Sequence, residues 1–282
     1  MNDATETRSY PFTKMEGLGN DFIIMDDLAC TTSFSADEVR NLCDRHFGIG
    51  ADGLILLRPA TEDEADFSWL FYNADGSIAE MCGNGIRCIG AYACEQGLVG
   101  AEQSRLRIQT DVGIRTINIL RDEDGDFQAA EVDMGQACIL EESYSPLFDQ
   151  KAGTGWEFFC VSMGNPHAVA FVDNVDNAPV DIVGPRVEHD PHFSAGTNVE
   201  FAAVLDRATL DLRVWERGVG ETLACGTGAC ATAVAAWCKG RCDERLTVRV
   251  PGGTLQIAID PATLQVMMTG PARTVFVGTI TR

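Results

Sequence analysis

The sequence predicts an α/β protein of the α+β type, with two pseudo-symmetric lobes that each wrap a mostly antiparallel sheet around one central helix. Two observations lead to this prediction. A cysteine followed by a glycine-rich turn and an apolar, helix-like segment occurs twice, at residues 79–97 and 222–240. Strand-like runs flank both copies in the same order. The period is far longer than the roughly 20 to 50 residues of a solenoid repeat, so a duplicated lobe is the better interpretation.

Three pairs of motifs support the duplication. Cys82 in "CGNG" and Cys225 in "CGTG" stand 143 positions apart. The other pairs keep nearly this spacing: "GLGNDF" at 17–22 matches "SMGNPH" at 162–167, and "HFGIGADG" at 46–53 matches "HFSAGTNV" at 192–199. Because order and spacing are both kept, we expect the two lobes to face each other, with the active site in the cleft between them.

Strands are predicted on both sides of each cysteine motif. In residues 209–216, Leu210, Leu212 and Val214 alternate with polar residues, which is the two-residue period of a strand with one buried face. The other predicted strands are "FSWLFYN" at 67–73, "RLRIQT" at 105–110, "IRTINIL" at 114–120, "RLTVRV" at 245–250 and "TLQIAID" at 254–260. The turn sequences "DVG" and "PGG" separate the paired runs.

A helix is predicted directly after each cysteine. In the first helix, Ile86, Ile89 and Ala93 have the spacing of a core-facing stripe, and Gly97 ends the helix. The second is apolar on nearly every side before it ends at Gly240. Such a helix is expected to be buried at the centre of its lobe.

The polar, turn-rich stretch "RDEDG" at 121–125 is the predicted domain boundary. It divides the chain into an N-terminal lobe of residues 1–124 and a C-terminal lobe of residues 125–270. The final strand, within residues 271–282, is a candidate to cross back to the first lobe.

Composition limits the function classes. A formal net charge of −21 argues against nucleic acid as a partner, because phosphates call for a basic surface. The longest apolar run is too short to span a bilayer, so no membrane association is expected. The N-terminal stretch lacks the charged and apolar regions of a secretory signal, and eleven cysteines without export suggest reduced thiols. We therefore expect a cytoplasmic protein.

Neither a metal nor a cofactor is expected. The chain has no CxxC pair, and Cys238 and Cys242 straddle a helix end without a nearby histidine. A pyridoxal enzyme would need a Schiff-base lysine, and none of Lys14, Lys151 and Lys239 is placed for that role. No GxGxxG follows a strand, and no P-loop is present.

A thiol at the start of a glycine-rich helix combines two chemical properties. The unpaired N–H groups of a helix N-terminus hold anions and lower the pKa of a neighbouring thiol from about 8.5. Two such helix starts could hold one carboxylate while the two sulfurs flank the carbon attached to it. One thiolate would remove a proton from that carbon, and the other thiol would deliver a proton to its opposite face. The pattern therefore predicts inversion of a carbon centre without a cofactor.

The motifs resemble those of the diaminopimelate epimerase family over nearly the whole chain. The resemblance is carried by "MEGLGNDFIIMD", "YNADGSIAEMCGNGIRC", "VSMGNPHAV" and "ERGVGETLACGTGACA". It implies a two-lobed fold, no cofactor, and interconversion of LL- and meso-2,6-diaminopimelate in the synthesis of lysine and peptidoglycan precursors. It also suggests a homodimer whose only other partner is the small-molecule substrate.

The resemblance further implies roles for individual residues. Cys82 and Cys225 would be the catalytic acid–base pair. The residues implied in substrate binding are Gly83, Asn84, Gly226 and Thr227 for the reacting carboxylate, Asn73 and Glu216 for the adjacent amine, and Asn20, Asn165, Asn198 and Arg217 for the distal end. His167 would line the cleft beside Glu216. Gly53 stands where some family members carry glutamine, which leaves one polar contact to the substrate open.

Other interpretations of these residues stay open at this point. The asparagines would ordinarily be turn residues, and Glu216 with Arg217 would be a surface ion pair. The proline racemase and hydroxyproline epimerase families resemble this architecture, but they carry histidine in the first motif where this chain has Asn84. A carboxylate-binding protein that uses helix N-termini without chemistry is the alternative from another class.

Overall fold

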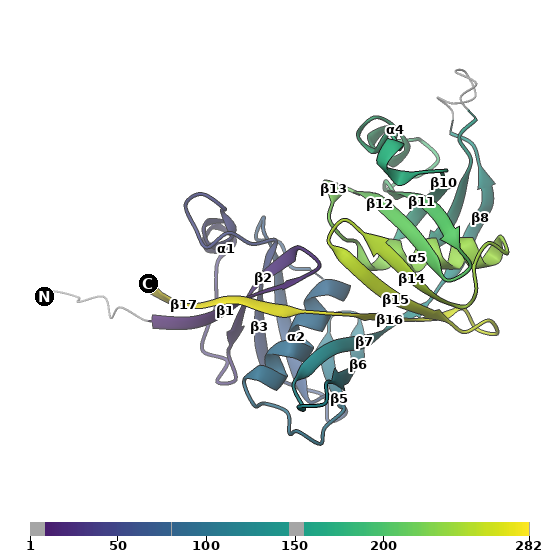
Figure 1. The fold of residues 1–282 in the computed structure, drawn as a ribbon. Coiled ribbons are helices and arrows are strands. Elements are labelled where there is room, and N and C mark those ends of the chain that lie inside the picture. Colours follow the sequence, from purple (N-terminus) through teal and green to yellow (C-terminus); the bar gives the residue numbers. More distant parts are fainter. Residues whose placement is uncertain (1–8, 80, 147–154, 282) are drawn as a thin grey trace, which may run out of the picture. The chain divides into compact units, whose positions relative to one another are not determined.

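The computed structural model of the chain describes residues 9–79, 81–146 and 155–281 (Figure 1). The chain divides into two compact units. Unit 1 consists of Met1–Ala130 together with Pro271–Arg282, and unit 2 consists of Glu131–Gly270. The polar stretch at 121–125 forms the turn that precedes β7, and the two units divide within that strand.

Unit 1 contains a sheet in which the neighbouring strands follow the order β17, β1, β2, β3, β4, β5 and β6. The pairs β2–β3 and β4–β5 are parallel, and the others are antiparallel. The strands are β1 (Ser9–Gly17), β2 (Asn20–Asp26), β3 (Gly53–Pro59), β4 (Phe67–Asn73), β5 (Arg105–Thr110), β6 (Gly113–Arg121) and β17 (Arg273–Thr281).

Unit 2 contains strands in the order β8, β9, β10, β11, β12, β14, β15 and β16, with β7 paired to β16 and β13 to β12. The pairs β10–β11 and β12–β14 are parallel. The strands are β7 (Phe127–Gln136), β8 (Cys138–Tyr144), β9 (Phe158–Ser162), β10 (Pro166–Phe171), β11 (Asn198–Asp206), β12 (Thr209–Glu216), β13 (Gly220–Thr222), β14 (Arg245–Val250), β15 (Gly253–Ile259) and β16 (Gln265–Gly270).

The two units repeat one topology, which confirms the predicted duplication. The parallel pair β2–β3 corresponds to β10–β11, and the parallel pair β4–β5 corresponds to β12–β14. Each parallel pair is joined to the next by an antiparallel one, β3–β4 in unit 1 and β11–β12 in unit 2. The fold is therefore of the α+β type, with mostly antiparallel strands in both units.

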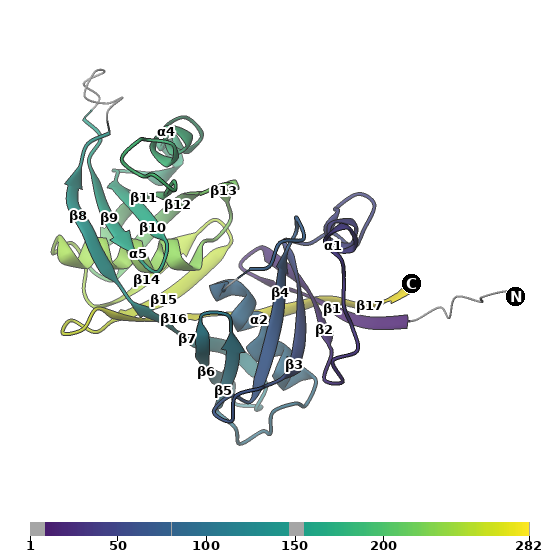
Figure 2. The same cartoon turned by 180° about the vertical axis from the view of Figure 1, so that it is seen from behind.

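One buried helix packs against the strands of each unit (Figures 1 and 2). Helix α2 (Gly83–Glu95) contacts β1, β2, β6 and β17, and all its residues from Gly83 to Ala93 are buried. Helix α5 (Gly226–Cys238) contacts β9 to β12 and β14 to β16, and nearly all of its residues are buried. The apolar sequence of α5 therefore reflects a position at the centre of unit 2, as predicted.

Within the described residues, two further helices were not predicted. Helix α1 (Ala36–Cys43) begins at a capping box in which Ser35 and Glu38 satisfy each other's backbone N–H groups, and it packs on β3. Helix α4 (Val180–Glu188), preceded by the 3₁₀ turn η1 (Val175–Asn177), packs on β11 and β12. Among the described residues, no helix is long and apolar enough to cross a bilayer.

Candidate active site

The two cysteines singled out by the sequence hold equivalent positions in the two units. Cys82 is the N-cap of α2, with φ −143° and ψ 119°, and Cys225 is the N-cap of α5, with φ −119° and ψ 113°. Each therefore has extended backbone directly before a helix. Gly83 and Gly226 follow them and are buried. The first-turn N–H groups of a helix have no intrahelical partner, so each thiol adjoins a set of donors suited to an anion.

In unit 1, Asn20 connects the cysteine turn to the start of β2. Its Oδ1 accepts hydrogen bonds from Cys82 Sγ at 3.5 Å and from Asn84 Nδ2 at 3.1 Å. Its Nδ2 donates to Asp52 Oδ2 at 2.7 Å. Three of the predicted site residues, Asn20, Cys82 and Asn84, are thus brought together, and Asp52 fixes which end of the Asn20 amide faces the thiol.

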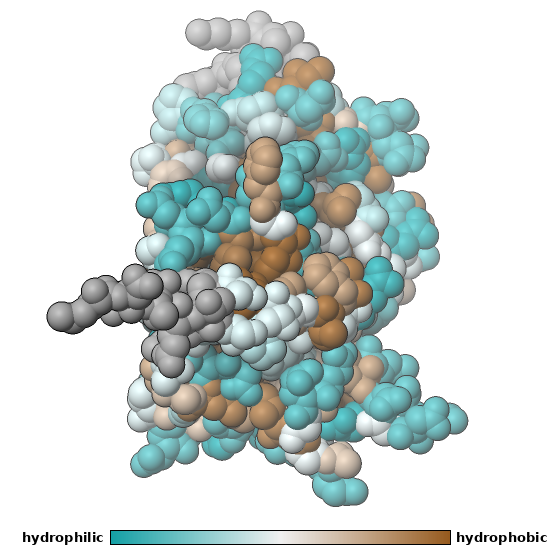
Figure 3. All heavy atoms as spheres, turned by 90° about the vertical axis from the view of Figure 1, so that its left-hand side faces the viewer, coloured by the Kyte–Doolittle hydropathy of each residue, from teal (hydrophilic) through white to brown (hydrophobic). Residues whose placement is uncertain are grey.

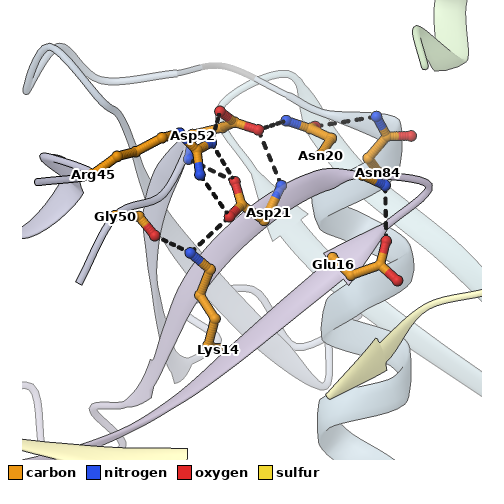
Figure 4. A network of polar contacts seen from close by, with 9 residues as sticks. Lys14, Glu16, Asn20, Asp21, Arg45, Gly50, Asp52 and Asn84 are labelled. Atoms are coloured by element: carbon orange, nitrogen blue, oxygen red, sulfur yellow. Dashed lines mark hydrogen bonds and ion pairs between the residues drawn. The ribbon is translucent and has the colours of Figure 1, made fainter. Parts of the chain in front are cut away.

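A charged network lies behind Asn20 (Figure 4). Asp21 pairs with Lys14 Nζ at 2.7 Å and with Arg45 Nη2 at 2.8 Å, and Arg45 also reaches Asp52 Oδ1 at 2.7 Å. Lys14, which is only 4% exposed, also donates to the carbonyl oxygen of Gly50. Buried charges persist only when they are paired in this way. The network therefore holds Asp52, and through it Asn20, in a fixed position.

The pKa of Asp21 shows the strength of this network. Burial alone would raise the pKa, but hydrogen bonds from Arg45 and Lys14 outweigh it and lower the pKa from 3.8 to about 2. The carboxylate therefore stabilises the folded state above about pH 4, and this contribution is lost as the pH falls toward 2.

We expect Asp21→Asn to lower the free energy of unfolding at pH 7 by about 1 to 2 kcal/mol, after a discount for partial exposure. Urea unfolding at pH 7 and at pH 2.5 measures this, and the difference between variant and wild type should shrink at the lower pH. Asp63→Asn, in an exposed loop, is the control and should change little at either pH. A difference for Asp21→Asn that does not depend on pH would contradict the assignment.

In unit 2, the Cys225 sulfur accepts a hydrogen bond from the backbone N–H of Gly228 at 3.4 Å. It also lies 3.5 Å from the Thr227 hydroxyl oxygen. Asn165 Nδ2 in turn donates to Thr227 Oγ1 at 3.4 Å. The first turn of α5 therefore surrounds this sulfur with donors, and Asn165, the counterpart of Asn20, contacts the same turn.

The expected lowering of the thiol pKa is wrong for Cys225. Burial raises the pKa of Cys225 well above 9, and the carboxyl groups of Glu216 and Glu200 raise it further. The hydrogen bonds from Thr227 and Gly228 lower it by less. A helix N-terminus favours the thiolate, but burial and two nearby acidic side chains favour the thiol at Cys225.

His167 lies behind Asn165 and is completely buried. Its Nε2 is 3.0 Å from Asn165 Oδ1, and its Nδ1 is 2.6 Å from Glu200 Oε1. The sequence placed His167 beside Glu216, and the structure shows that its two ring nitrogens contact Asn165 and Glu200.

The remaining predicted residues of unit 2 gather near the ends of β11 and β12. Asn198 Nδ2 donates to the carbonyl oxygen of Pro166 at 2.9 Å, and its Oδ1 accepts from the backbone N–H of Arg217 at 3.0 Å. Glu216, the last residue of β12, accepts from the Thr222 hydroxyl at 2.6 Å. The Arg217 side chain is exposed, and its Nη1 donates to the carbonyl oxygen of Ala195 at 3.2 Å.

Asn73 occupies the corresponding place in unit 1, at the end of β4. It is exposed, and its Nδ2 donates to Ser77 Oγ at 3.0 Å. Asn73 and Glu216 thus end equivalent strands, each shortly before a cysteine turn. No cluster of three or more histidine, cysteine, aspartate or glutamate side chains suited to a metal occurs in the described part of the chain.

Gly53, where the resemblance left a glutamine contact open, has a structural reason to lack a side chain. A Cβ atom at this position would lie 2.6 Å from the Tyr72 carbonyl oxygen and 2.7 Å from the Phe71 ring. β3 and β4 therefore leave no room for a polar side chain here.

Two residues of the site were missed in the sequence, Asp52 and Glu200. Asp52 aligns with Asn198 in the repeated motif at 46–53 and 192–199, so the repeat itself contained the signal. Glu200 stands as a lone acidic residue in the apolar run "VEFAAV", and an acid in a buried strand is rarely present without a partner.

Comparisons with a family model and with individual proteins identify the same family. A family model described as diaminopimelate epimerase matches residues 12–140 and 159–275. Proteins named diaminopimelate epimerase from Acetivibrio thermocellus, Synechocystis sp. and Moorella thermoacetica are 44%, 46% and 47% identical to this chain. The alignments cover 95% of this chain and 98%, 97% and 98% of theirs.

Solved structures with low sequence identity share the fold. A phenazine biosynthesis protein of the PhzF family from Bacillus anthracis has a TM-score of 0.74 at 15% identity, covering 97% of this chain and 99% of that chain. A hydroxyproline epimerase from Agrobacterium vitis, solved with trans-4-hydroxy-L-proline, has a TM-score of 0.71 at 15% identity, covering 97% and 91%.

Proposed function

Because the chain belongs to the diaminopimelate epimerase family, we propose that it interconverts LL- and meso-2,6-diaminopimelate by moving a proton at one α-carbon. The observation that carries the proposal is the pair of equivalent thiols, Cys82 and Cys225, each at the N-cap of a buried, glycine-rich helix start. A two-base inversion needs an acid on one face of the carbon and a base on the other, and the duplication supplies two thiols that can exchange these roles.

In the proposed reaction, one sulfur acts as thiolate and removes the α-proton, while the other acts as thiol and donates a proton to the opposite face. The roles are exchanged in the reverse direction. General acid–base catalysis contributes about 10² to 10⁴-fold. The larger part must come from stabilisation of the charge that develops on the substrate carboxylate, which the first-turn N–H groups of α2 and α5 are suited to provide.

Binding of the substrate must shift the proton equilibrium of Cys225. Burial and two nearby carboxyl groups raise the pKa of Cys225. A substrate ammonium group next to Glu216 would offset the negative charge of this side chain. We propose that Asn73 and Glu216 bind the reacting amine, while Asn20, Asn165, Asn198 and Arg217 bind the distal amino acid end, where a guanidinium suits a carboxylate.

The proposed reaction needs no organic cofactor, and the lysines support this. Lys14 is buried and paired with Asp21, and Lys239 pairs with Glu157 at 3.2 Å. Lys151 lies outside the described residues. Both described lysines are thus engaged in ion pairs.

Incubation of the purified protein with LL-diaminopimelate in heavy water tests the proposal. We expect the meso isomer to form with one deuterium at the inverted carbon. Proline and hydroxyproline, tested in parallel, should not be turned over. Isotope exchange with proline alone would favour a racemase of the related class, and the absence of any exchange would leave a carboxylate-binding protein.

We propose in addition a homodimer in the cytoplasm. Val275, Phe276 and Val277 of β17 are 54%, 46% and 70% exposed, and Figure 3 shows apolar side chains exposed on the face where the terminal strands lie. Val275 and Val277 lie on the same face of β17, and exposed apolar residues that share a face are typical of an interaction surface, here for a second copy. All eleven cysteines are free, which suits a reducing compartment. Sedimentation should give twice the monomer mass of 30.5 kDa, and a monomer at working concentrations would contradict the dimer.

A further inference from the structure

A continuous chain of polar contacts runs from a buried carboxyl group to Cys225. Glu200 Oε1 is 2.6 Å from His167 Nδ1, and His167 Nε2 is 3.0 Å from Asn165 Oδ1. The other end of the same carboxamide donates to Thr227 at 3.4 Å, and Thr227 lies 3.5 Å from the Cys225 sulfur. The residues come from β11, β10, the turn before β10 and the first turn of α5.

The position of the protons follows from the chemistry of these groups. Asn165 Oδ1 is only an acceptor, so His167 Nε2 must carry a hydrogen to bond it. His167 Nδ1 then either shares a second proton with an ionised Glu200 or accepts one from the protonated acid. Both arrangements leave the pair neutral.

The alternative arrangement would leave a net negative charge in the core. It has a bare Nε2 on His167 and an ionised Glu200, and both side chains are 0% exposed. An unpaired buried charge costs several kcal/mol. Among the described residues, Glu200 Oε2 is also buried without a hydrogen-bond partner, and burial raises the pKa of Glu200. A bare Nε2 with a protonated Glu200 would be neutral too, but it would place two acceptors, Nε2 and Asn165 Oδ1, 3.0 Å apart. The neutral pair with a protonated Nε2 is therefore favoured.

The corresponding asparagine of unit 1 has the opposite orientation. Asn20 donates through Nδ2 to the Asp52 carboxylate, so its Oδ1 faces Cys82. Asn165 accepts through Oδ1 from His167, so its Nδ2 faces the Cys225 turn. Both units carry asparagine at this position. The orientation of each carboxamide is therefore set by its second partner, Asp52 in unit 1 and His167 in unit 2.

Glu200 also packs directly under the first turn of α5. A Cβ atom at Gly228 would lie 2.8 Å from Glu200 Oε1 and 3.2 Å from the Cys225 Cβ. The carboxyl group is thus confined between the histidine and the helix start, and it cannot move without disturbing one of them.

We propose that Glu200 is a positioning residue for the reaction: its carboxyl group, paired with His167, holds the Asn165 carboxamide with its NH₂ group toward Thr227 and Cys225. The expected effect on turnover rests on the proposed function, but the orientation of the Asn165 carboxamide does not. A misplacement of about 1 Å in a catalytic constellation can cost on the order of 10²-fold in rate.

Two variants at Glu200 distinguish the loss of its hydrogen bond to His167 from a change in side-chain volume. In Glu200→Gln the amide N–H can donate to His167 Nδ1 and keep the hydrogen on Nε2, so we expect kcat/KM within about threefold of wild type. In Glu200→Leu the partner of Nδ1 is lost at similar volume, and we expect a loss of about tenfold or more, mainly in kcat. Thr232→Val, a buried substitution in α5, is the control and should match wild type.

The tautomer of His167 gives a readout that needs no turnover. In ¹⁵N-histidine-labelled protein, which has four histidines, we expect a protonated Nε2 on His167 in wild type and in Glu200→Gln, and a mixture of tautomers in Glu200→Leu. A bare Nε2 in wild type would overturn the proposal, as would a folded Glu200→Gln that loses as much activity as Glu200→Leu. If Glu200→Leu does not fold, the proposal is tested by the ¹⁵N signals of His167 in wild type and Glu200→Gln, together with the activity of Glu200→Gln. An inactive wild type with the expected tautomer would refute the proposed function and leave the positioning intact.

Discussion

Alanine in place of Cys82 or Cys225 is expected to lower the rate of epimerisation by about 10² to 10⁴-fold, because each sulfur supplies one of the two proton transfers. The effect should fall on kcat rather than on KM, since the carboxylate-binding N–H groups of the helix starts remain. Steady-state kinetics with LL-diaminopimelate measures the effect, with the meso isomer as substrate for the reverse direction.

Controls distinguish loss of the acid or base from loss of structure. Cys225→Ser keeps an N-cap oxygen that can accept the hydrogen bond from Gly228, and it should fold like wild type but remain severely impaired. Cys88→Ala and Cys230→Ala remove buried thiols from within α2 and α5, and they should retain turnover within a few-fold. Near-normal activity of either alanine variant at Cys82 or Cys225 would refute the two-base assignment.

A side chain at Gly53 is expected to destabilise unit 1. The added Cβ of Gly53→Ala would lie 2.6 Å from the backbone oxygen of Tyr72, which cannot move without separating β3 from β4. Overpacking of this kind costs about 1 to 3 kcal/mol, and contact with backbone places this variant at about 3 kcal/mol. Thermal or urea unfolding measures the change.

Gly100→Ala is the matched control, because a Cβ atom there would have none of the described atoms within 4 Å. It should leave the free energy of unfolding within about 0.5 kcal/mol of wild type. If Gly53→Ala were as stable as Gly100→Ala, the predicted clash of the added Cβ with the Tyr72 carbonyl oxygen would be refuted.

The fold could be predicted where the sequence pattern was regular. The predicted strand at 209–216 coincides with β12 because Leu210, Leu212 and Val214 alternate cleanly and are all buried. Helix α4 could not be predicted in the same way, since it is short and contains Pro185. Helix α1 was predictable from its capping box, with Ser35 three residues before Glu38, but its apolar stripe is short.

The candidate site could be predicted only in part. The repeat identified Cys82 and Cys225 because a thiol before a glycine-rich helix is a local pattern. The partnership of His167 with Glu200 depends on the parallel pairing of β10 with β11, which places His167 opposite Asn198. The pKa of Cys225 was predicted in the wrong direction, because burial and the charges of Glu200 and Glu216 become known only from the packed structure.

Strand β17 follows unit 2 in the chain but pairs with β1. A ribosome therefore releases all of unit 2 before it releases the last strand of unit 1. Until then β1 of the nascent protein has one open edge, and such an edge is a template for pairing with another chain. The second half of the protein can complete its sheet first, while the sheet of the first half stays open at β1 until the last strand is synthesised.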